Sequence, residues 1–476
     1  MSGSCLDGVA LSATAIAGVV IGTVAFEYVL STTSSLLNYW RLQESKIPVE
    51  MEGVYDADDY AKSQLYTRDK TAYGLCYHTF DVLTFASFWA LGGFQAVDVL
   101  VQSIAPSSLL MQGLAYIGTI VVGSSVLSLP WSIYSTFVLE EKHGFNRTTC
   151  KTFVTDMIKA TGLGVVIGTP LLAAFLWFFL KTSHAWFYCF ATLASAQLLI
   201  MLIAPTYIMP LFLSFTPLPE GELRTAIEKY ATHVGFSFGN IYEIDGKTRS
   251  AHSNAFFTGF GSSKRIALYD TLIKQCTVDE MVAVVAHEVG HEKSHHQIRS
   301  AAFVMSYLFF VFYALGVVIS YPPLFAAFGV ERVSVHVGLV IAQLLFQPVD
   351  TFLQVVLNVR SRANEFEADR YSVDTYREPE VLATALKKLC KQNLSNLTPH
   401  PLLVFLEYTH PPILERVAAI RAHADKGGIT GNLSKPKRAG RPPSPGRAKS
   451  SPARARPARS ASPAASRSGK KAPEMI

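Results

Sequence analysis

The chain has 476 residues and a net charge of +6, with 50% hydrophobic and only 16% charged residues. Soluble domains are about a quarter charged, so this composition argues against an ordinary cytosolic enzyme and excludes a chain that is disordered throughout. The charge is uneven: residues 432–476 hold 12 Lys and Arg against the single acid Glu474, which leaves the rest of the chain mildly acidic.

Seven apolar segments are long enough to cross a bilayer, which takes about 20 residues. They lie near residues 9–30, 79–100, 109–137, 161–180, 185–213, 301–320 and 335–357. Seven such runs favour membrane helices over the buried helices of a large soluble core. We expect Pro130, Pro205 and Pro210 to kink the third and fifth of these helices.

The loop charges predict the orientation of these spans. Loop 38–78 carries five Lys and Arg, loop 101–108 carries none and loop 138–160 carries four. By the positive-inside rule, the N-terminus is lumenal, and the segment 214–300 and the C-terminus are cytosolic.

The predicted spans also hold four acidic residues, Glu27, Asp81, Asp98 and Asp350. Charges are costly inside a bilayer. They could line a wet interior cavity or lie near span ends and reach the headgroups, and the sequence leaves both interpretations open.

The segment 214–300 has the pattern of a folded α/β unit. We expect a helix near 221–234, strands near 239–244, 252–260 and 264–269, and a second helix over 278–298. Thr277 and Glu280 have the spacing of a capping box at the start of that second helix. Helical patterns recur at 360–376, 379–392 and 411–424.

The sequence HEVGH at residues 287–291 falls on the predicted helix 278–298. His287 and His291 are one turn apart and face the same way, a spacing that suits a Zn²⁺ ion. Glu288 is the residue type that takes a proton from water at such a site. Two ligands are too few, so a third protein ligand is required.

Candidates for the third ligand lie in the sequence EFEAD at residues 365–369. Glu365 and Asp369 share a helix face, which fits a ligand and a carboxylate that supports it, whereas Glu367 points to another face. Spacing alone also allows a solvated acidic face that pairs with Arg360, Arg362 and Arg370.

HEVGH followed far downstream by EFEAD resembles the gluzincin membrane metalloproteases. The seven spans and four further segments narrow the resemblance to the type I CAAX prenyl proteases, which are integral-membrane zinc enzymes. These segments are EEKHGFN at 140–146, TPLPEG at 216–221, HSNAF at 252–256 and HPPILER at 410–416.

The resemblance implies one Zn²⁺ ion per chain, bound by His287, His291 and Glu365. It also implies Glu288 as general base. By the same resemblance Asp369 supports the site or donates a proton, His410 approaches the substrate carbonyl, and Asn254 pairs with the substrate backbone. Asn254 could instead be a turn residue, and His410 could belong to the turn that starts a helix. Glu367 stands where the family pattern leads us to expect a neutral residue, which leaves open which Glu binds the metal.

The implied fold is a multi-pass α-helical membrane protein, with about seven transmembrane helices and a gluzincin-type α+β zinc metalloprotease domain. The implied organisation is membrane helices 1–5 over 1–213, a cytosolic zinc-protease segment over 214–300 and membrane helices 6 and 7 over 301–357. The third-ligand helix and C-terminal helices follow over 358–428. Residues 429–476 form a basic tail that we expect to be disordered.

The implied activity is removal of the C-terminal tripeptide from isoprenylated CAAX proteins. The partners are then farnesylated or geranylgeranylated protein C-termini and the lipid bilayer, with no nucleic acid expected. The location is the endoplasmic-reticulum membrane, with the nuclear envelope as a second location and the active site facing the cytosol. The alternatives are a membrane quality-control zinc protease of the heat-shock type and a membrane scaffold without enzymatic activity.

Overall fold

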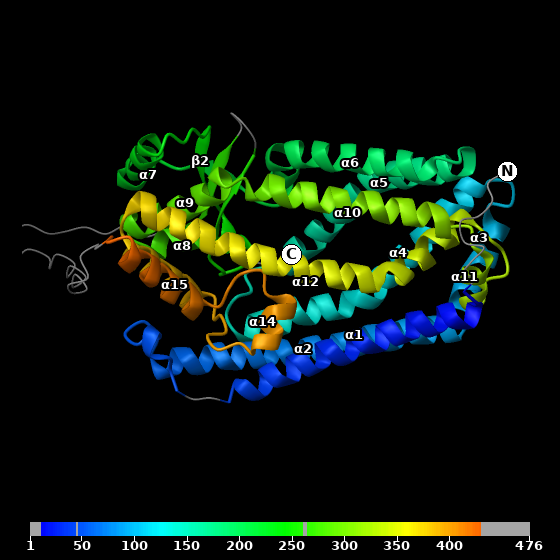
Figure 1. The fold of residues 1–476 in the computed structure, drawn as a ribbon, viewed down its shortest axis with the longest axis horizontal. Coiled ribbons are helices and arrows are strands. Elements are labelled where there is room, and N and C mark those ends of the chain that lie inside the picture. Colours follow the sequence, from blue (N-terminus) through cyan, green and yellow to red (C-terminus); the bar gives the residue numbers. More distant parts are fainter. Residues whose placement is uncertain (1–10, 44–45, 260–263, 430–476) are drawn as a thin grey trace, which may run out of the picture. The chain divides into compact units, whose positions relative to one another are not determined.

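The structure is a computed structural model that describes residues 11–43, 46–259 and 264–429. The predicted basic tail, the first residues of the first predicted span and part of the turn after Gly259 lie outside the described residues. The described chain is mostly helical and contains one small β-sheet (Figure 1).

Six helices of the described chain are long and apolar enough to cross a membrane, or seven if one bent pair counts as a single span. The six single spans are α1 (Ala13–Arg41), α4 (Leu109–Tyr134), α5 (Cys150–Lys181), α6 (Ala185–Ile203), α10 (His296–Val318) and α12 (Val335–Tyr376). The bent pair is α2 (Ala57–Ala90) with α3 (Gly93–Ile104). The prediction of about seven membrane helices is confirmed.

The second predicted span, 79–100, is not one straight helix. α2 and α3 meet at an angle of 63°, and the residue before α3, Gly92, has a left-handed backbone with φ 72°. Glycine adopts this conformation without the strain that a Cβ would cause, so the bend follows from the Gly92-Gly93 pair. A hydropathy pattern does not report such a break.

All three prolines that we expected to cause kinks lie at or near irregular helical turns. α4 contains Pro130 and continues into a π-helical turn, η2 (Ser135–Glu140). α6 continues into a second π-helical turn, η3 (Ala204–Ile208), which contains Pro205, and a 3₁₀ turn that contains Pro210, η4 (Met209–Leu211), follows. Proline removes a helical hydrogen bond, which accounts for irregular turns at these positions.

The predicted helices 335–357 and 360–376 are one continuous helix, α12. Its 42 residues span about 63 Å, roughly twice the hydrocarbon thickness of a bilayer. Its first half packs against α4 and α11 (Pro322–Ala327), and its second half packs against α9 (Val278–Lys293) and α15 (Ile413–Lys426) (Figure 1). α12 therefore connects the membrane helices directly to the predicted protease segment.

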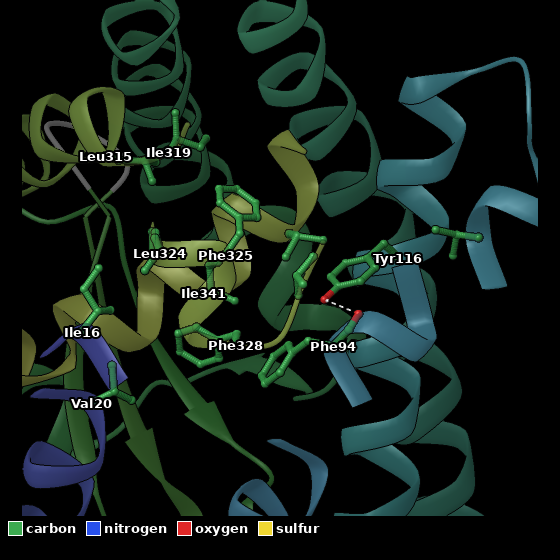
Figure 2. Packing of buried hydrophobic residues seen from close by; sticks show 14 of the residues in the cluster. Ile16, Val20, Phe94, Tyr116, Leu315, Ile319, Leu324, Phe325, Phe328 and Ile341 are labelled. Atoms are coloured by element: carbon green, nitrogen blue, oxygen red, sulfur yellow. Dashed lines mark hydrogen bonds between the residues drawn. The ribbon is translucent and has the colours of Figure 1, made fainter. Parts of the chain in front are cut away.

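The membrane helices share an apolar core. Figure 2 shows Ile16 and Val20 of α1, together with residues of α3, α4, α10, α11 and α12, packed around Phe325 and Phe328. Tyr116 Oη donates a hydrogen bond to the carbonyl oxygen of Phe94 at 3.5 Å. This core holds the ends of α3, α4 and α12 together.

The acidic residues of the spans do not share one environment. Glu27 and Asp81 line a cavity of about 660 Å³ between α1, α2, α4 and α12, as the wet-cavity interpretation expects. Asp98 is fully buried, where Arg332 Nη2 lies 2.9 Å and His336 Nε2 lies 2.8 Å from its Oδ1. Asp350 accepts a hydrogen bond from Tyr307.

The segment 214–300 contains a four-stranded sheet in the order β1-β2-β4-β3. Its strands are β1 (Phe215–Pro217), β2 (Asn240–Ile244), β3 (Ala255–Thr258) and β4 (Arg265–Tyr269). β2 and β4 are parallel, and the other two pairs are antiparallel. The three expected strands are confirmed, whereas β1 was not expected, because two prolines near it indicate a turn. β3 lies at an edge of the sheet.

Helices on the sheet and beyond it complete the protease segment. α7 (Glu222–His233) and α9 pack with the sheet around a buried core that includes Ile227, Leu268 and Val285. The short α8 (Asp270–Gln275) precedes α9, and α13 (Pro379–Gln392), α14 (Pro401–Glu407) and α15 follow α12. Short 3₁₀ turns, η1 (Val49–Met51) and η5 (Gly246–Thr248), lie in loops.

Candidate metal centre

The helix α9 begins with the predicted capping box. Thr277 Oγ1 accepts a hydrogen bond from the Glu280 backbone N–H, and the Glu280 side chain accepts one from the Thr277 N–H. Most of the following helix is buried, so its register is fixed by packing on the sheet and on α12. This register places His287 and His291 on one face, with their Nε2 atoms 3.1 Å apart.

The helix α12 brings Glu365 to these two imidazoles. One carboxylate oxygen of Glu365 is 3.5 Å from His287 Nε2 and the other is 3.2 Å from His291 Nε2. The helices approach closely at Gly290, and the Ser372 hydroxyl donates a buried hydrogen bond of 3.0 Å to the carbonyl oxygen of Ala283. Glu365 lies more than 70 positions after the two histidines in the sequence, and it meets them because α9 and α12 pack side by side.

The donor set fits a zinc ion. Zinc binds two nitrogens and one oxygen at about 2.0–2.2 Å in tetrahedral geometry, which puts the donors about 3.3 Å from one another. The two imidazole Nε2 atoms lie 3.1 Å apart, and each lies 3.2–3.5 Å from a different oxygen of the Glu365 carboxylate, which is close to this value. In the described part of the chain, these three residues are the cluster of His, Cys, Asp and Glu that could hold a metal.

Both histidines are oriented by a group behind them, which is a carboxylate for His287 and a third histidine for His291. His287 Nδ1 is 2.9 Å from Asp369 Oδ1. His291 Nδ1 is 2.9 Å from His296 Nδ1, and His296 Nε2 is 3.2 Å from Glu367 Oε2. Hydrogen bonds of this kind fix the tautomer and the ring orientation of a metal ligand. Glu367 therefore acts on the donor cluster only through His296, and its own side chain is 42% exposed.

Arg416 of α15 neutralises the carboxylates of this cluster. Its guanidinium donates two hydrogen bonds to Asp369, at 2.7 and 2.9 Å, and its Nη1 lies 3.0 Å from Glu365 Oε2. All three side chains are nearly fully buried. A buried carboxylate pair without a counter-charge would be strongly destabilising, so Arg416 is a positioning residue for the ligand and for its support.

The electrostatic field at the cluster favours a positive charge. Burial lowers the pKa of His287, but the hydrogen bonds that its imidazole donates to Asp369 and Glu365 outweigh burial and raise this pKa to about 9. The same two carboxylates would attract a divalent cation at that position.

Glu288 follows His287 but takes no part in the donor cluster. It forms no hydrogen bond or ion pair with another side chain among the residues that the structure describes. Burial raises the pKa of its carboxyl group, while His287 and His291 oppose this rise. A carboxylate with a raised pKa and no fixed partner is suited to accept and return a proton.

The two predicted substrate-contacting residues lie at different distances from this cluster. His410 Nε2 is 3.4 Å from Glu365 Oε1, and the His410 side chain is 65% exposed. The exposed Asn254 precedes the edge strand β3, and its carbonyl oxygen accepts a hydrogen bond from the Tyr269 N–H at 3.1 Å. His410 thus contacts the donor cluster, whereas Asn254 is on the sheet.

Two residues of the site, Arg416 and His296, were not predicted from the sequence. Arg416 ends the HPPILER segment, and His296 follows HEVGH by five residues. The role of Arg416 could have been suspected from the sequence, because Arg416 lies in the same HPPILER segment as His410, which was already a candidate. The signal for His296 was weak, because a histidine after a polar helix end is ordinarily solvated.

Gly290 allows α9 and α12 to approach one another. A Cβ at this position would lie 3.0 Å from the Ala368 Cα and 3.1 Å from the Ala368 carbonyl oxygen, which is backbone that cannot rotate away. We expect Gly290→Ala to lower stability by about 1–3 kcal/mol and to weaken zinc binding, because it separates the histidines from Glu365. Thermal unfolding and zinc titration measure these effects. Gly162→Ala, which adds a Cβ in open space, is the control, and equal effects of both changes would contradict the close-approach argument.

Family models match both halves of the chain, and both models describe proteases. A family model described as the CAAX prenyl protease N-terminal region with five membrane helices matches residues 38–214, and the model of peptidase family M48 matches residues 217–424.

This chain aligns with nearly the whole length of similar proteins. CAAX prenyl protease 1 homolog of Arabidopsis thaliana is 36% identical over 412 residues, which are 84% of this chain and 96% of the relative. CAAX prenyl protease 1 of Saccharomyces cerevisiae is 34% identical over 439 residues, covering 86% and 95%. The crystal structure of S. mikatae Ste24p superposes with a TM-score of 0.80 at 32% identity, covering 85% of this chain and 99% of that one.

Proposed function

The chain belongs to the CAAX prenyl protease family of M48 metallopeptidases, and from this membership we propose that it is a zinc endopeptidase that removes the C-terminal tripeptide from isoprenylated CAAX proteins. The observation that carries the proposal is the meeting of His287, His291 and Glu365 at separations of 3.1–3.5 Å. The M48 family consists of metallopeptidases, so membership implies a metal cofactor. The two nitrogen donors and one oxygen donor favour zinc as that metal.

Each site residue has a role that its contacts support. Zinc, when bound, would polarise the scissile carbonyl and lower the pKa of water to near neutral. Glu288 takes the proton from the attacking water onto its carboxylate and returns it to the leaving amine. His410, exposed beside Glu365, donates a hydrogen bond to the developing oxyanion.

The remaining groups orient the ligands and the substrate. Asp369 holds the Nδ1 proton of His287, so that Nε2 is free to bind the metal. Arg416 neutralises Asp369 and Glu365 without a direct part in bond cleavage. Asn254, at the edge strand β3, pairs with the substrate backbone, since an unpaired strand edge accepts an added strand.

A membrane setting suits this substrate class. Each buried CH₂ of an isoprenyl group contributes about 0.8 kcal/mol to partitioning, so prenylated C-termini are concentrated in the bilayer that the membrane helices would cross. We place the protein in the endoplasmic-reticulum membrane, with the nuclear envelope as a second location, and the active site in the cytosol.

The loop charges make this orientation testable. A glycosylation tag placed before residue 8 should be modified, and a tag after residue 430 should stay unmodified, because the charge pattern predicts a lumenal N-terminus and a cytosolic C-terminus. A mobility shift that glycosidase removes is the measurement. Modification of the C-terminal tag alone would overturn the orientation.

The function is tested with a pair of peptides. Purified protein should cleave a farnesylated CAAX peptide and release a tripeptide, and a chelator should stop the cleavage until zinc is restored. The unprenylated twin should be a much poorer substrate. Equal cleavage of both peptides would favour the alternative, a membrane quality-control zinc protease.

A further inference from the structure

A cavity of about 740 Å³ joins the candidate metal centre to helix α2. Its lining includes His410 and Arg416, which both contact Glu365, and also Lys70 of α2 and His252, two residues before Asn254. Ligand sites in proteins have volumes of about 300–1,000 Å³, so the cavity has the size of a ligand site and adjoins the reacting centre.

Lys70 is a cation of this cavity, and its charge acts through space on the Glu140 carboxylate. Of the described residues that line the cavity, Lys70 and Arg416 carry the permanent positive charges, and Arg416 is paired with Asp369 and Glu365. The exposed Lys70 ammonium lies 5.0 Å from the centroid of the Tyr66 ring. No ion pair joins it to a carboxylate in the part of the chain that the structure describes.

The acidic groups near Lys70 are already engaged. Asp69, its neighbour in the sequence, is bound by Lys142 at 2.6 Å and by His143 at 2.7 Å. Glu140 accepts a hydrogen bond of 2.8 Å from Tyr66 and lies 3.5 Å from His252. The carboxyl group that lines the cavity is Glu407, and burial raises its pKa. The ammonium of Lys70 thus retains donors for an anion that enters the cavity.

The proposed substrate carries such an anion close to the scissile bond. This step rests on the proposed function: in a CAAX protein, three residues separate the cleaved bond from the free C-terminal carboxylate. Three extended residues span about 10 Å. If the substrate pairs antiparallel with β3, the residues after the scissile bond run from Asn254 toward His252, and so into the cavity that Lys70 lines.

We propose that Lys70 binds the C-terminal carboxylate of the substrate and thereby sets the length of the peptide that is removed. Lys70 lines the cavity, and the donor cluster adjoins it through His410 and Arg416, which both contact Glu365. A chain end bound at Lys70 places a bond three residues upstream at the donor cluster. Lys70 is then a specificity-determining residue that selects free C-termini over internal segments.

The test compares a farnesylated CAAX peptide that has a free carboxylate with the same peptide ending in an amide. Hydrogen bonds between two charged groups are the stronger class, and we expect wild-type kcat/KM to be tenfold to hundredfold higher for the acid. In Lys70→Met the ratio of kcat/KM for the acid peptide to that for the amide peptide should fall to within about threefold. Only kcat/KM for the acid peptide should decrease. Lys70→Arg should restore much of the preference for the acid peptide. Lys62→Met, two turns away on α2 and outside the cavity, is the matched control.

The ratio of acid to amide cleavage is insensitive to partial misfolding, because misfolded protein lowers both rates equally. An unchanged ratio in Lys70→Met, or an equal loss for both peptides, would overturn the assignment of Lys70 and leave the proposed function intact. Failure of the wild type to cleave either peptide would overturn the proposed function and this inference with it.

Discussion

Glu288→Gln should lower kcat for peptide cleavage by about 10²–10⁴-fold, the usual contribution of a general base, while about one zinc ion per chain stays bound. The structure explains why activity should be lost while zinc stays bound. The Glu288 side chain forms no hydrogen bond or ion pair within the described chain and lies outside the cluster of His287, His291 and Glu365. The amide keeps the shape of the side chain but cannot accept the proton. Steady-state kinetics and metal analysis of the same preparation measure both quantities.

His287→Ala is the comparison for this prediction. It removes one of three donors and also leaves Asp369 without the imidazole that lies 2.9 Å from it, so both zinc and activity should be lost. If Glu288→Gln released zinc as completely as His287→Ala does, the division between base and ligand would be wrong.

The sequence was informative wherever a local pattern decides structure. The length of the apolar segments predicted the membrane helices. The spacing of Thr277 and Glu280 predicted a capping box, and both of its hydrogen bonds are present. The resemblance to CAAX prenyl proteases is confirmed by family matches over 38–214 and 217–424. These features depend on residues that lie within a few turns of one another or on whole motifs.

The features that could not be predicted depend on tertiary contacts or on backbone conformation. The bend at Gly92 keeps the hydropathy of a span but changes its direction by 63°. α12 is continuous where separate segments were expected over 335–357 and 360–376, and at the junction the buried Asn358 side chain donates a hydrogen bond to the carbonyl oxygen of Leu406. Arg416 meets Asp369 across 47 residues of sequence, so spacing carries no information about that contact.

Glu367 illustrates how packing resolves an ambiguity that spacing leaves open. Both Glu365 and Glu367 are carboxylates on α12 near a histidine, and the family pattern raised a doubt about Glu367. Only Glu365 faces the imidazole Nε2 atoms, with 6% of its side chain exposed, whereas Glu367 bonds to His296 on the far side of His291. The geometry therefore supports Glu365 as the third donor and gives Glu367 an indirect role.

Glu365→Gln should weaken zinc binding by tenfold or more, because even changes behind the ligands cost about 10–100-fold and this change neutralises a donor. Glu367→Gln should bind zinc within a few-fold of wild type, since a glutamine oxygen can still accept the hydrogen bond of His296 Nε2. Asp369→Asn should fall between them, because an amide can keep one contact with Arg416 but no longer holds the Nδ1 proton of His287 as strongly. Zinc titration against a competing chelator ranks the three variants on one scale. Release of the metal by Glu367→Gln together with its retention by Glu365→Gln would reassign the third ligand, and with it the face of α12 that supports the site.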